Sequence, residues 1–156
     1  MSVPLHHAAI HVHDVDASLR FYREGLGLRV LMDQTFDGDW PELFGAPSRR
    51  LRSVFLGDPS SPEAGIVELV AFDGGVPARG VSERAAALPP STGFFLLSFF
   101  VDVDATLARL DRLGLAREPR RISQPSPNGP IAMVTVRDPD GVLVELVDLL
   151  AHDRPS

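Results

Sequence analysis

Two glutamates stand inside apolar runs of the sequence, in the identical tetrapeptides Val67–Val70 and Val144–Val147. An ionised carboxylate within a sheet is costly unless it is paired or binds a metal. Glu68 and Glu145 are therefore candidates for the base and acid of a proton transfer. Because neighbouring strand residues face opposite ways, the alternative is that both glutamates face solvent while the flanking valines and leucines fill the core.

Histidine is the second residue type that could do chemistry. His7 could bind a metal or substrate, because neutral imidazole is a good ligand, or it could be an exposed residue beside His6. His11 shares a strand face with His7 but lies roughly 13 Å away at strand spacing, so the two cannot hold one metal ion. His11 could instead carry a proton or donate a hydrogen bond at the other end of a pocket, or it could be partly solvated.

Several kinds of chemistry are excluded by composition. The chain has no cysteine, and all 15 basic residues are arginine, so disulfides, thiolates, Schiff bases and a phosphate-binding lysine are absent. The net charge of −6 comes without a basic run, and we expect no nucleic-acid partner. No apolar run reaches about 20 residues and no signal peptide is readable, so we expect no membrane partner and a cytoplasmic location.

The sequence repeats itself in two halves, which indicates the elements that position these residues. Three segments of the first half recur in the same order in the second, namely 12–28 at 101–115, 54–59 at 134–139 and 67–70 at 144–147. We therefore predict one domain over residues 1–156, with a first module at about 4–73, a linker at 74–91 and a second module at about 92–150.

Each module is predicted to contain one helix and several strands. In the first module, strands are expected near 5–12, 28–35, 52–56 and 66–72, from their apolar, β-branched or alternating patterns. Asp14 or Asp16 can cap a helix whose apolar residues, Phe21 and Tyr22 among them, are expected to pack in the core. Residues 36–50 are expected to form a loop or short lid. There Trp40 could close over a ligand or anchor the loop, and the arginines at 49, 50 and 52 could meet an anionic substrate or form a solvated strand edge.

The order of these motifs resembles the vicinal oxygen chelate superfamily, which includes glyoxalases, bleomycin-resistance proteins and extradiol dioxygenases. The resemblance covers nearly the whole chain. It is carried by the helix motif from Asp14 through Phe21-Tyr22 to Leu26-Gly27, and by the hairpin Asp138-Pro139-Asp140-Gly141 followed by Glu145. The resemblance implies an α+β fold, in which two tandem βαβββ modules form a cupped mixed sheet around a shared pocket. With that geometry, we expect Glu68 and Glu145 to face the pocket.

The resemblance also implies a ligand set for a divalent ion, which this sequence fills incompletely. By position the ligands would be His7, a residue at 95 or 96, Glu68 and Glu145. Phe95 or Leu96 stands where relatives place a histidine, so one imidazole and two carboxylates remain. The ion implied is Mn, Mg, Ni, Fe or Zn, and the alternative is that none binds.

Three functions follow from the resemblance, each with a small-molecule ligand. The first is metal-assisted proton abstraction next to a carbonyl of a small oxygenated metabolite, as in epimerases, isomerases and glyoxalase-like lyases. The second is metal-free binding of a drug or metabolite, as in bleomycin-resistance proteins, and the third is extradiol-type dioxygenation. Relatives often form homodimers, which we also expect here. The candidate substrate-binding residues are His11, Trp40, Leu96, Ser98 and Phe100.

Overall fold

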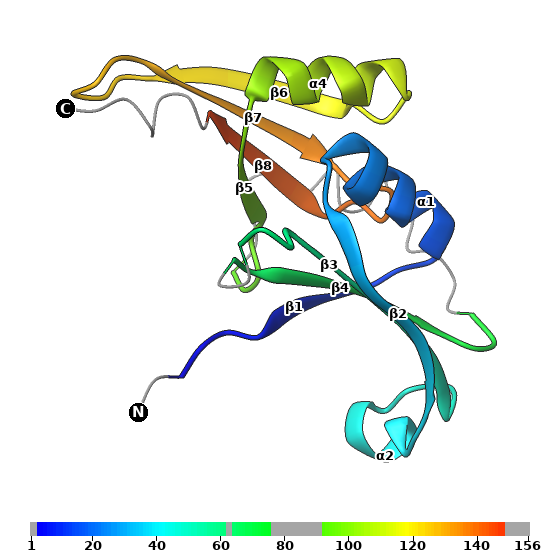
Figure 1. The fold of residues 1–156 in the computed structure, drawn as a ribbon. Coiled ribbons are helices and arrows are strands. Elements are labelled where there is room, and N and C mark those ends of the chain that lie inside the picture. The colour runs from blue at the N-terminus through cyan, green and yellow to red at the C-terminus, as the bar shows by residue number, and fades with distance from the viewer. Residues whose placement is uncertain (1–2, 62–63, 76–91, 149–156) are drawn as a thin grey trace. The chain divides into compact units, whose positions relative to one another are not determined.

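The computed structural model describes residues 3–61, 64–75 and 92–148. The chain divides into two compact units, residues 1–78 and 79–156. In each unit a strand and a helical segment are followed by three further strands, and in the first unit a short helix separates the second strand from the third (Figure 1). This confirms the α+β class and the two βαβββ modules predicted from the repeat. Residues 76–91 of the predicted linker and the last two residues of the second module lie outside the described residues.

In the first unit the strands form a four-stranded sheet in the order β1-β4-β3-β2. Strand β1 is parallel to β4, and the other neighbours are antiparallel. A short α-helix continues directly into a π-helical segment between β1 and β2, and another short helix joins β2 to β3. The elements are β1 (His7–His11), α1 (Val15–Leu19), η1 (Arg20–Gly25), β2 (Arg29–Asp37), α2 (Trp40–Phe44), β3 (Arg50–Gly57) and β4 (Ile66–Phe72).

The core of the first unit lies on one face of this sheet. Val54 and Leu69 point to that face and are fully buried, and so are Phe21 and Tyr22 of η1. The prediction that the two aromatic residues pack in the core is therefore confirmed. Strand alternation turns residues such as Ser53, Phe55 and Glu68 to the opposite face.

The helix of the first unit begins where the sequence offered two possible caps. The side chain of Asp14 accepts hydrogen bonds from the backbone N–H groups of Asp16 and Ala17, at 2.9 and 3.1 Å. Asp14 is thus the capping residue, because its carboxylate satisfies N–H groups that have no partner within the first helical turn.

The segment from 36 to 50 departs from the predicted loop. Strand β2 extends to Asp37 and β3 starts at Arg50, so the two strands form a longer hairpin than expected. Between them lies α2, which has a proline in its first turn and ends at Gly45 with a φ of 64°. Glycine suits this end because the left-handed conformation is costly for other residues.

The second unit repeats the topology of the first. Its sheet has the order β5-β8-β7-β6, and β5 is parallel to β8. The Asp138-Pro139-Asp140-Gly141 turn precedes the last strand, and Asp138 is fully buried while its carboxylate accepts from two backbone N–H groups of that turn. The elements are β5 (Leu97–Val101), α4 (Val103–Arg112), β6 (Arg117–Gln124), β7 (Ile131–Arg137) and β8 (Leu143–Asp148).

Within the described residues, no helix is both long and apolar enough to span a membrane.

Candidate functional site

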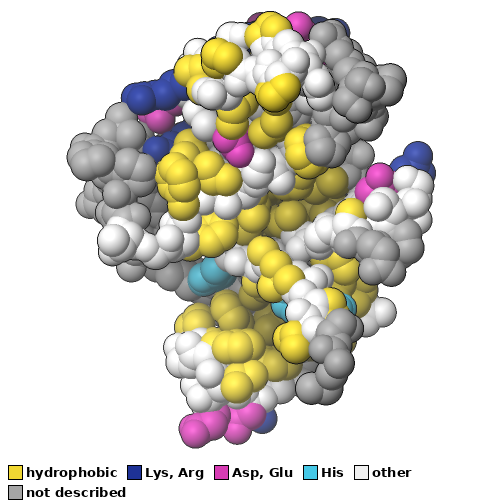
Figure 2. Space-filling view, turned by 90° about the vertical axis from the view of Figure 1, so that its left-hand side faces the viewer, with side chains coloured by type: hydrophobic (Ala, Val, Ile, Leu, Met, Phe, Trp, Pro, Cys, Tyr) yellow, Lys and Arg dark blue, Asp and Glu magenta, His cyan; other side chains and the backbone are white. Residues whose placement is uncertain are grey.

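A cavity of about 630 Å³ lies over the sheet face of the first unit that does not carry the core. Its lining comes from all four strands and from α2. In the space-filling view, hydrophobic side chains and histidine surround a hollowed surface (Figure 2). Of the candidate site residues, His7, His11, Trp40 and Glu68 line this cavity.

Glu68 is the only carboxylate among the described lining residues, and two side chains hold it in place. The hydroxyl of Ser53 donates to Glu68 Oε1 at 2.5 Å, and His7 Nε2 lies 3.1 Å from Glu68 Oε2. The side chain of Glu68 is 13% exposed and that of His7 is 36% exposed. The carboxylate is therefore largely removed from water but keeps a partner on each oxygen, which offsets part of the cost of burial.

The strand register explains why these three residues meet. Glu68 on β4 pairs with Ala9 on parallel β1 and with Phe55 on antiparallel β3. His7 precedes Ala9 by two residues and Ser53 precedes Phe55 by two, so both share the face of Glu68. A shift of one residue in either pairing would turn these partners to the opposite face.

A second histidine extends this group. His6 Nδ1 lies 2.7 Å from His7 Nδ1, and the ring of Phe55 packs beside both imidazoles. If His7 is neutral and donates through Nε2 to Glu68, its Nδ1 must accept, so His6 donates from Nδ1. The contacts therefore favour one arrangement of protons along His6, His7 and Glu68.

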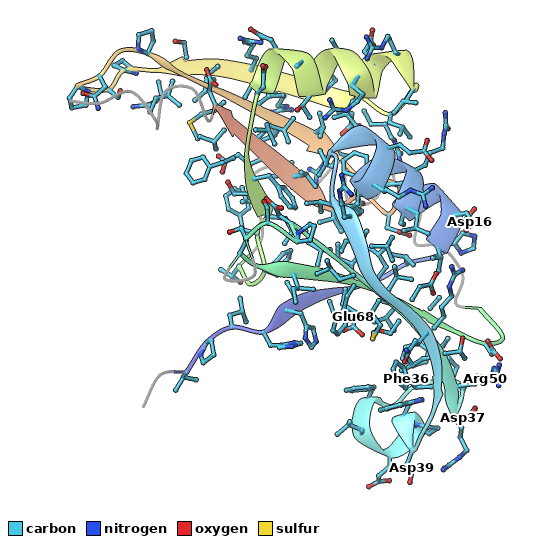
Figure 3. The ribbon with its side chains drawn as sticks, viewed as in Figure 1. Asp16, Phe36, Asp37, Asp39, Arg50 and Glu68 are labelled. Carbon is cyan, nitrogen blue, oxygen red and sulfur yellow. The ribbon has the colours of Figure 1, made fainter. Side chains whose placement is uncertain are left out.

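Aromatic side chains dominate the other end of the cavity. Trp40 and Phe44 of α2 stack at 5.8 Å with 9° between their planes, and Trp40 Nε1 donates to the carbonyl oxygen of Phe36 at 3.4 Å. Phe72 of β4 also lines the cavity, and its ring meets the His11 ring edge-on, with 5.2 Å between the ring centroids. In Figure 3, Phe36 lies near α2 and Glu68 projects from the sheet.

The remaining candidates belong to the second unit. Glu145 on β8 is half-buried and pairs with Ser98 on β5 and Thr135 on β7. Since Glu68 pairs with Ala9 in the same way, Ser98 corresponds to Ala9 and Leu96 corresponds to His7. The register thus decides between positions 95 and 96. Phe100 lies on the same strand face as Ser98 and is 58% exposed.

The described residues fill the expected ligand set of a divalent ion only in part. His7 and Glu68 are close enough to act as two ligands, but the position equivalent to His7 holds Leu96, which has no donor atom. In residues 3–61, 64–75 and 92–148, no group of three or more His, Asp or Glu side chains could hold one ion. Catalytic metal sites generally use three protein ligands.

The arginines near the cavity are bound to carboxylates. Arg49 donates to Asp39 at 2.8 Å, and Arg50 lies near Asp73 at 3.4 Å. Arg52 binds both oxygens of Asp33, at 2.9 and 2.7 Å, on the sheet face opposite Ser53. The hydrogen bonds from Arg52 hold the pKa of Asp33 below its usual value. The cluster that could have met an anionic substrate is thus engaged within the protein.

Two residues next to Glu68 and His7 could not be picked out from the sequence. Ser53 was not singled out, although it interrupts an apolar strand on the same alternating face as Phe55. His6 was read only as a neighbour of His7, because nothing in the sequence shows that the two rings make contact.

Comparison with known proteins places this chain in a family. Residues 4–146 match the family model described as Glyoxalase/Bleomycin resistance protein/Dioxygenase superfamily. The lactoylglutathione lyase-like protein terB of Aspergillus terreus is 38% identical over 149 residues, which cover 92% of this chain and 74% of that protein.

Solved structures of glyoxalase-family proteins share the fold. A glyoxalase family protein from Bacillus cereus has a TM-score of 0.72 at 20% identity, with 95% of each chain covered. A glyoxalase family protein from Enterococcus faecalis has a TM-score of 0.59 at 26% identity, covering 92% of this chain and 95% of that one. The trypanothione-dependent glyoxalase I of Leishmania major has a TM-score of 0.62 at 24% identity, covering 97% and 90%. The chain therefore belongs to the glyoxalase/bleomycin resistance protein/dioxygenase superfamily.

Proposed function

We propose that this protein is an enzyme that moves a proton at the carbon next to a carbonyl group of a small molecule, with Glu68 as the base. One observation carries the proposal. A carboxylate that is 13% exposed lies in a mostly apolar cavity with one oxygen fixed by Ser53 and the other facing the imidazole of His7. A buried base that is held in position is the usual requirement for this chemistry.

The spacing of the two groups suits an enolisable carbonyl compound. Glu68 Oε2 and His7 Nε2 are 3.1 Å apart, so one can face a C–H bond while the other faces the adjacent carbonyl oxygen. Glu68 would take the proton from carbon, the electron pair of that C–H bond would form a carbon–carbon double bond, and the π electrons of the carbonyl would move onto its oxygen. The N–H of His7 would donate a hydrogen bond to this oxygen, and the carboxyl group would return a proton to carbon in the second step.

This proposal assigns no step to a metal ion. The sequence suggested metal-assisted abstraction, but the position that corresponds to His7 is Leu96, so the expected ligand set lacks its second imidazole. We therefore expect that a chelator leaves the reaction unchanged, and that added Mn, Mg, Ni, Fe or Zn does not accelerate it.

The name of the Aspergillus relative suggests a glutathione conjugate as substrate, and the cavity supports a different one. Glutathione carries two carboxylates, which proteins generally bind with arginine or lysine. The described lining includes no arginine, and the three nearby arginines are bound to aspartates. We therefore propose the same type of proton transfer on a substrate without the peptide.

The test is deuterium exchange into 2-tetralone, a bicyclic ketone with protons next to its carbonyl. Wild-type protein in D₂O with a chelator should accelerate the exchange, as followed by proton NMR. Glu68→Gln should remove about 100-fold of this acceleration, the usual lower range for a general base. Glu24→Gln is the matched control, because Glu24 lies on η1 and is 43% exposed.

Three results would overturn the proposal. The first is exchange that is equally fast with Glu68→Gln, the second is exchange that disappears with the chelator and returns with a divalent ion, and the third is the absence of any exchange with the wild type. Binding of 2-tetralone without any exchange would support the second candidate, a metal-free binding protein. The apolar lining and Leu96 in place of a ligand favour that function over dioxygenation.

A further inference from the structure

We propose that the ligand of this cavity is an uncharged, planar aromatic molecule with a carbonyl or phenol oxygen. Its oxygen would face His7 and Glu68, and its ring would lie against the aromatic residues near α2. This inference deepens the proposed function by naming the substrate class, and for the orientation of the ligand it rests on that function.

The strand register arranges the cavity floor in rows. Phe36, Leu51 and Phe72 pair across β2, β3 and β4 and form one row. Glu68 belongs to a row further along the sheet, with Phe55 as its partner. Phe72 is four residues from Glu68 on β4, about 13 Å at strand spacing, which leaves room for a fused ring system between the carboxylate and the aromatic row.

The far end of the cavity has the character of a stacking site. Trp40 and Phe44 are parallel, and Phe36 joins them through the hydrogen bond from the indole of Trp40 to its backbone. Phe44 is 62% exposed and Phe36 is 38% exposed, which is unusual for large aromatic residues that line a cavity. A flat ring would bury this surface, and aromatic pairs contribute stacking energy beyond area alone.

The chemistry of the lining disfavours an anionic ligand. Glu68 is the one carboxylate among the described lining residues, and the histidines are their other ionisable groups. An anion near Glu68 would be repelled within a region of low dielectric, and the arginines that could compensate are bound to aspartates. The same carboxylate favours a ligand that donates a hydrogen bond or brings an acidic C–H.

Trp40 makes the test direct, because it is the single tryptophan of the chain. Its indole N–H gives one cross-peak in a ¹H–¹⁵N spectrum. Titration with 2-tetralone should shift this cross-peak saturably. Titration with 2-naphthoate, an anion of similar size and shape, should require at least tenfold higher concentration.

Variants of Phe44 and Glu68 test which side chains contact the ligand. Phe44→Ala should weaken 2-tetralone binding at least fivefold, whereas Leu43→Ala should not, since Leu43 is 68% exposed on the same helix and is not part of the lining. Glu68→Gln should bring the affinity for 2-naphthoate close to that for 2-tetralone, because the repulsive charge is gone.

Three results would overturn the ligand class. The wild type could bind 2-naphthoate as tightly as 2-tetralone, or Leu43→Ala and Phe44→Ala could change the affinity for 2-tetralone equally. The third result is a Trp40 indole cross-peak that does not shift on addition of 2-tetralone. The ligand class can fail separately from the proposed function. Selective binding of 2-tetralone without deuterium exchange supports the ligand class and contradicts the proton transfer. Exchange that is just as fast for small aliphatic ketones contradicts the ligand class alone.

Discussion

At the scale of residues, the proposed proton transfer depends on the contacts that hold the Glu68 carboxylate. Each carboxylate oxygen has its own partner, one a buried hydroxyl and the other a half-buried imidazole. The two contacts have different roles: the hydroxyl fixes the direction of the carboxylate, whereas the imidazole carries the N–H that the proposed reaction directs at the substrate oxygen. The contact with Ser53 and the contact with His7 should therefore be tested by different measurements.

Ser53→Ala should reduce the exchange rate about tenfold without abolishing it, because the carboxylate remains but loses its orientation. Ser53 is 2% exposed, and removal of its hydroxyl leaves a carboxylate oxygen without a donor. Stability should fall by about 1.5–3 kcal/mol, as for other hydrogen bonds to a charged group. Urea unfolding measures the stability. Ser123→Ala on exposed β6 is the control, and an unchanged exchange rate in Ser53→Ala would contradict the role of the hydroxyl.

The protonation of His7 gives a prediction that needs no substrate. The contacts with Glu68 and His6 require a neutral His7 to carry its proton on Nε2. Long-range ¹H–¹⁵N correlation spectra at pH 8 should therefore show the Nε2–H tautomer for His7 and the Nδ1–H tautomer for His6. The opposite tautomer at His7 would mean that the imidazole does not donate to Glu68.

At the scale of elements, the β2–β3 hairpin positions the aromatic end of the cavity. It carries α2 at its tip, and the face of β3 opposite the cavity joins β2 through the bidentate Asp33–Arg52 pair. The sequence had indicated a loop or short lid over 36–50. Propensity alone did not reveal α2, because a five-residue helix with proline and glycine at its ends resembles a turn-rich segment.

Asp33→Asn should destabilise the protein at neutral pH, and the difference from wild type should shrink in acid. The folded pKa of Asp33 is lowered by hydrogen bonds from Arg52, so its contribution is present above the unfolded value and is lost as the pH falls through the folded value. Both side chains are 38% exposed, and solvent screening limits the effect to about 0.5–1 kcal/mol.

Urea midpoints at pH 7, 4 and 2.5 measure this difference, with Asp111→Asn on the exposed face of α4 as the control. A difference between Asp33→Asn and wild type that stays constant or grows on acidification would contradict the assignment of the stabilising pair.

At the scale of the whole molecule, the sequence predicted the architecture because it repeats. The two Val-Glu-Leu-Val tetrapeptides mark β4 and β8, and each pairs with the first strand of its own unit. Alternation along these strands then decided which residues share the face of Glu68. Strand ends shifted by one or two residues, since β1 starts at His7 rather than Leu5 and β2 ends at Asp37.

The candidate site was predicted only in part. His7, Glu68, His11 and Trp40 do line one cavity, whereas the contacts of Glu68 with Ser53 and of His6 with His7 depend on register and rotamer, which spacing in the sequence does not specify. The action of Glu145 together with Glu68, and the roles of Leu96, Ser98 and Phe100 in binding, stay predictions.

Whether Glu68 takes a proton from the bound ligand is tested by measuring binding and exchange of 2-tetralone on one sample of Glu68→Gln. We expect the affinity to stay within about threefold of wild type while the exchange rate falls by about 100-fold, because the amide keeps the shape of the side chain but cannot act as a base. Exchange that persists at the wild-type rate in Glu68→Gln would contradict the assignment of Glu68 as the base.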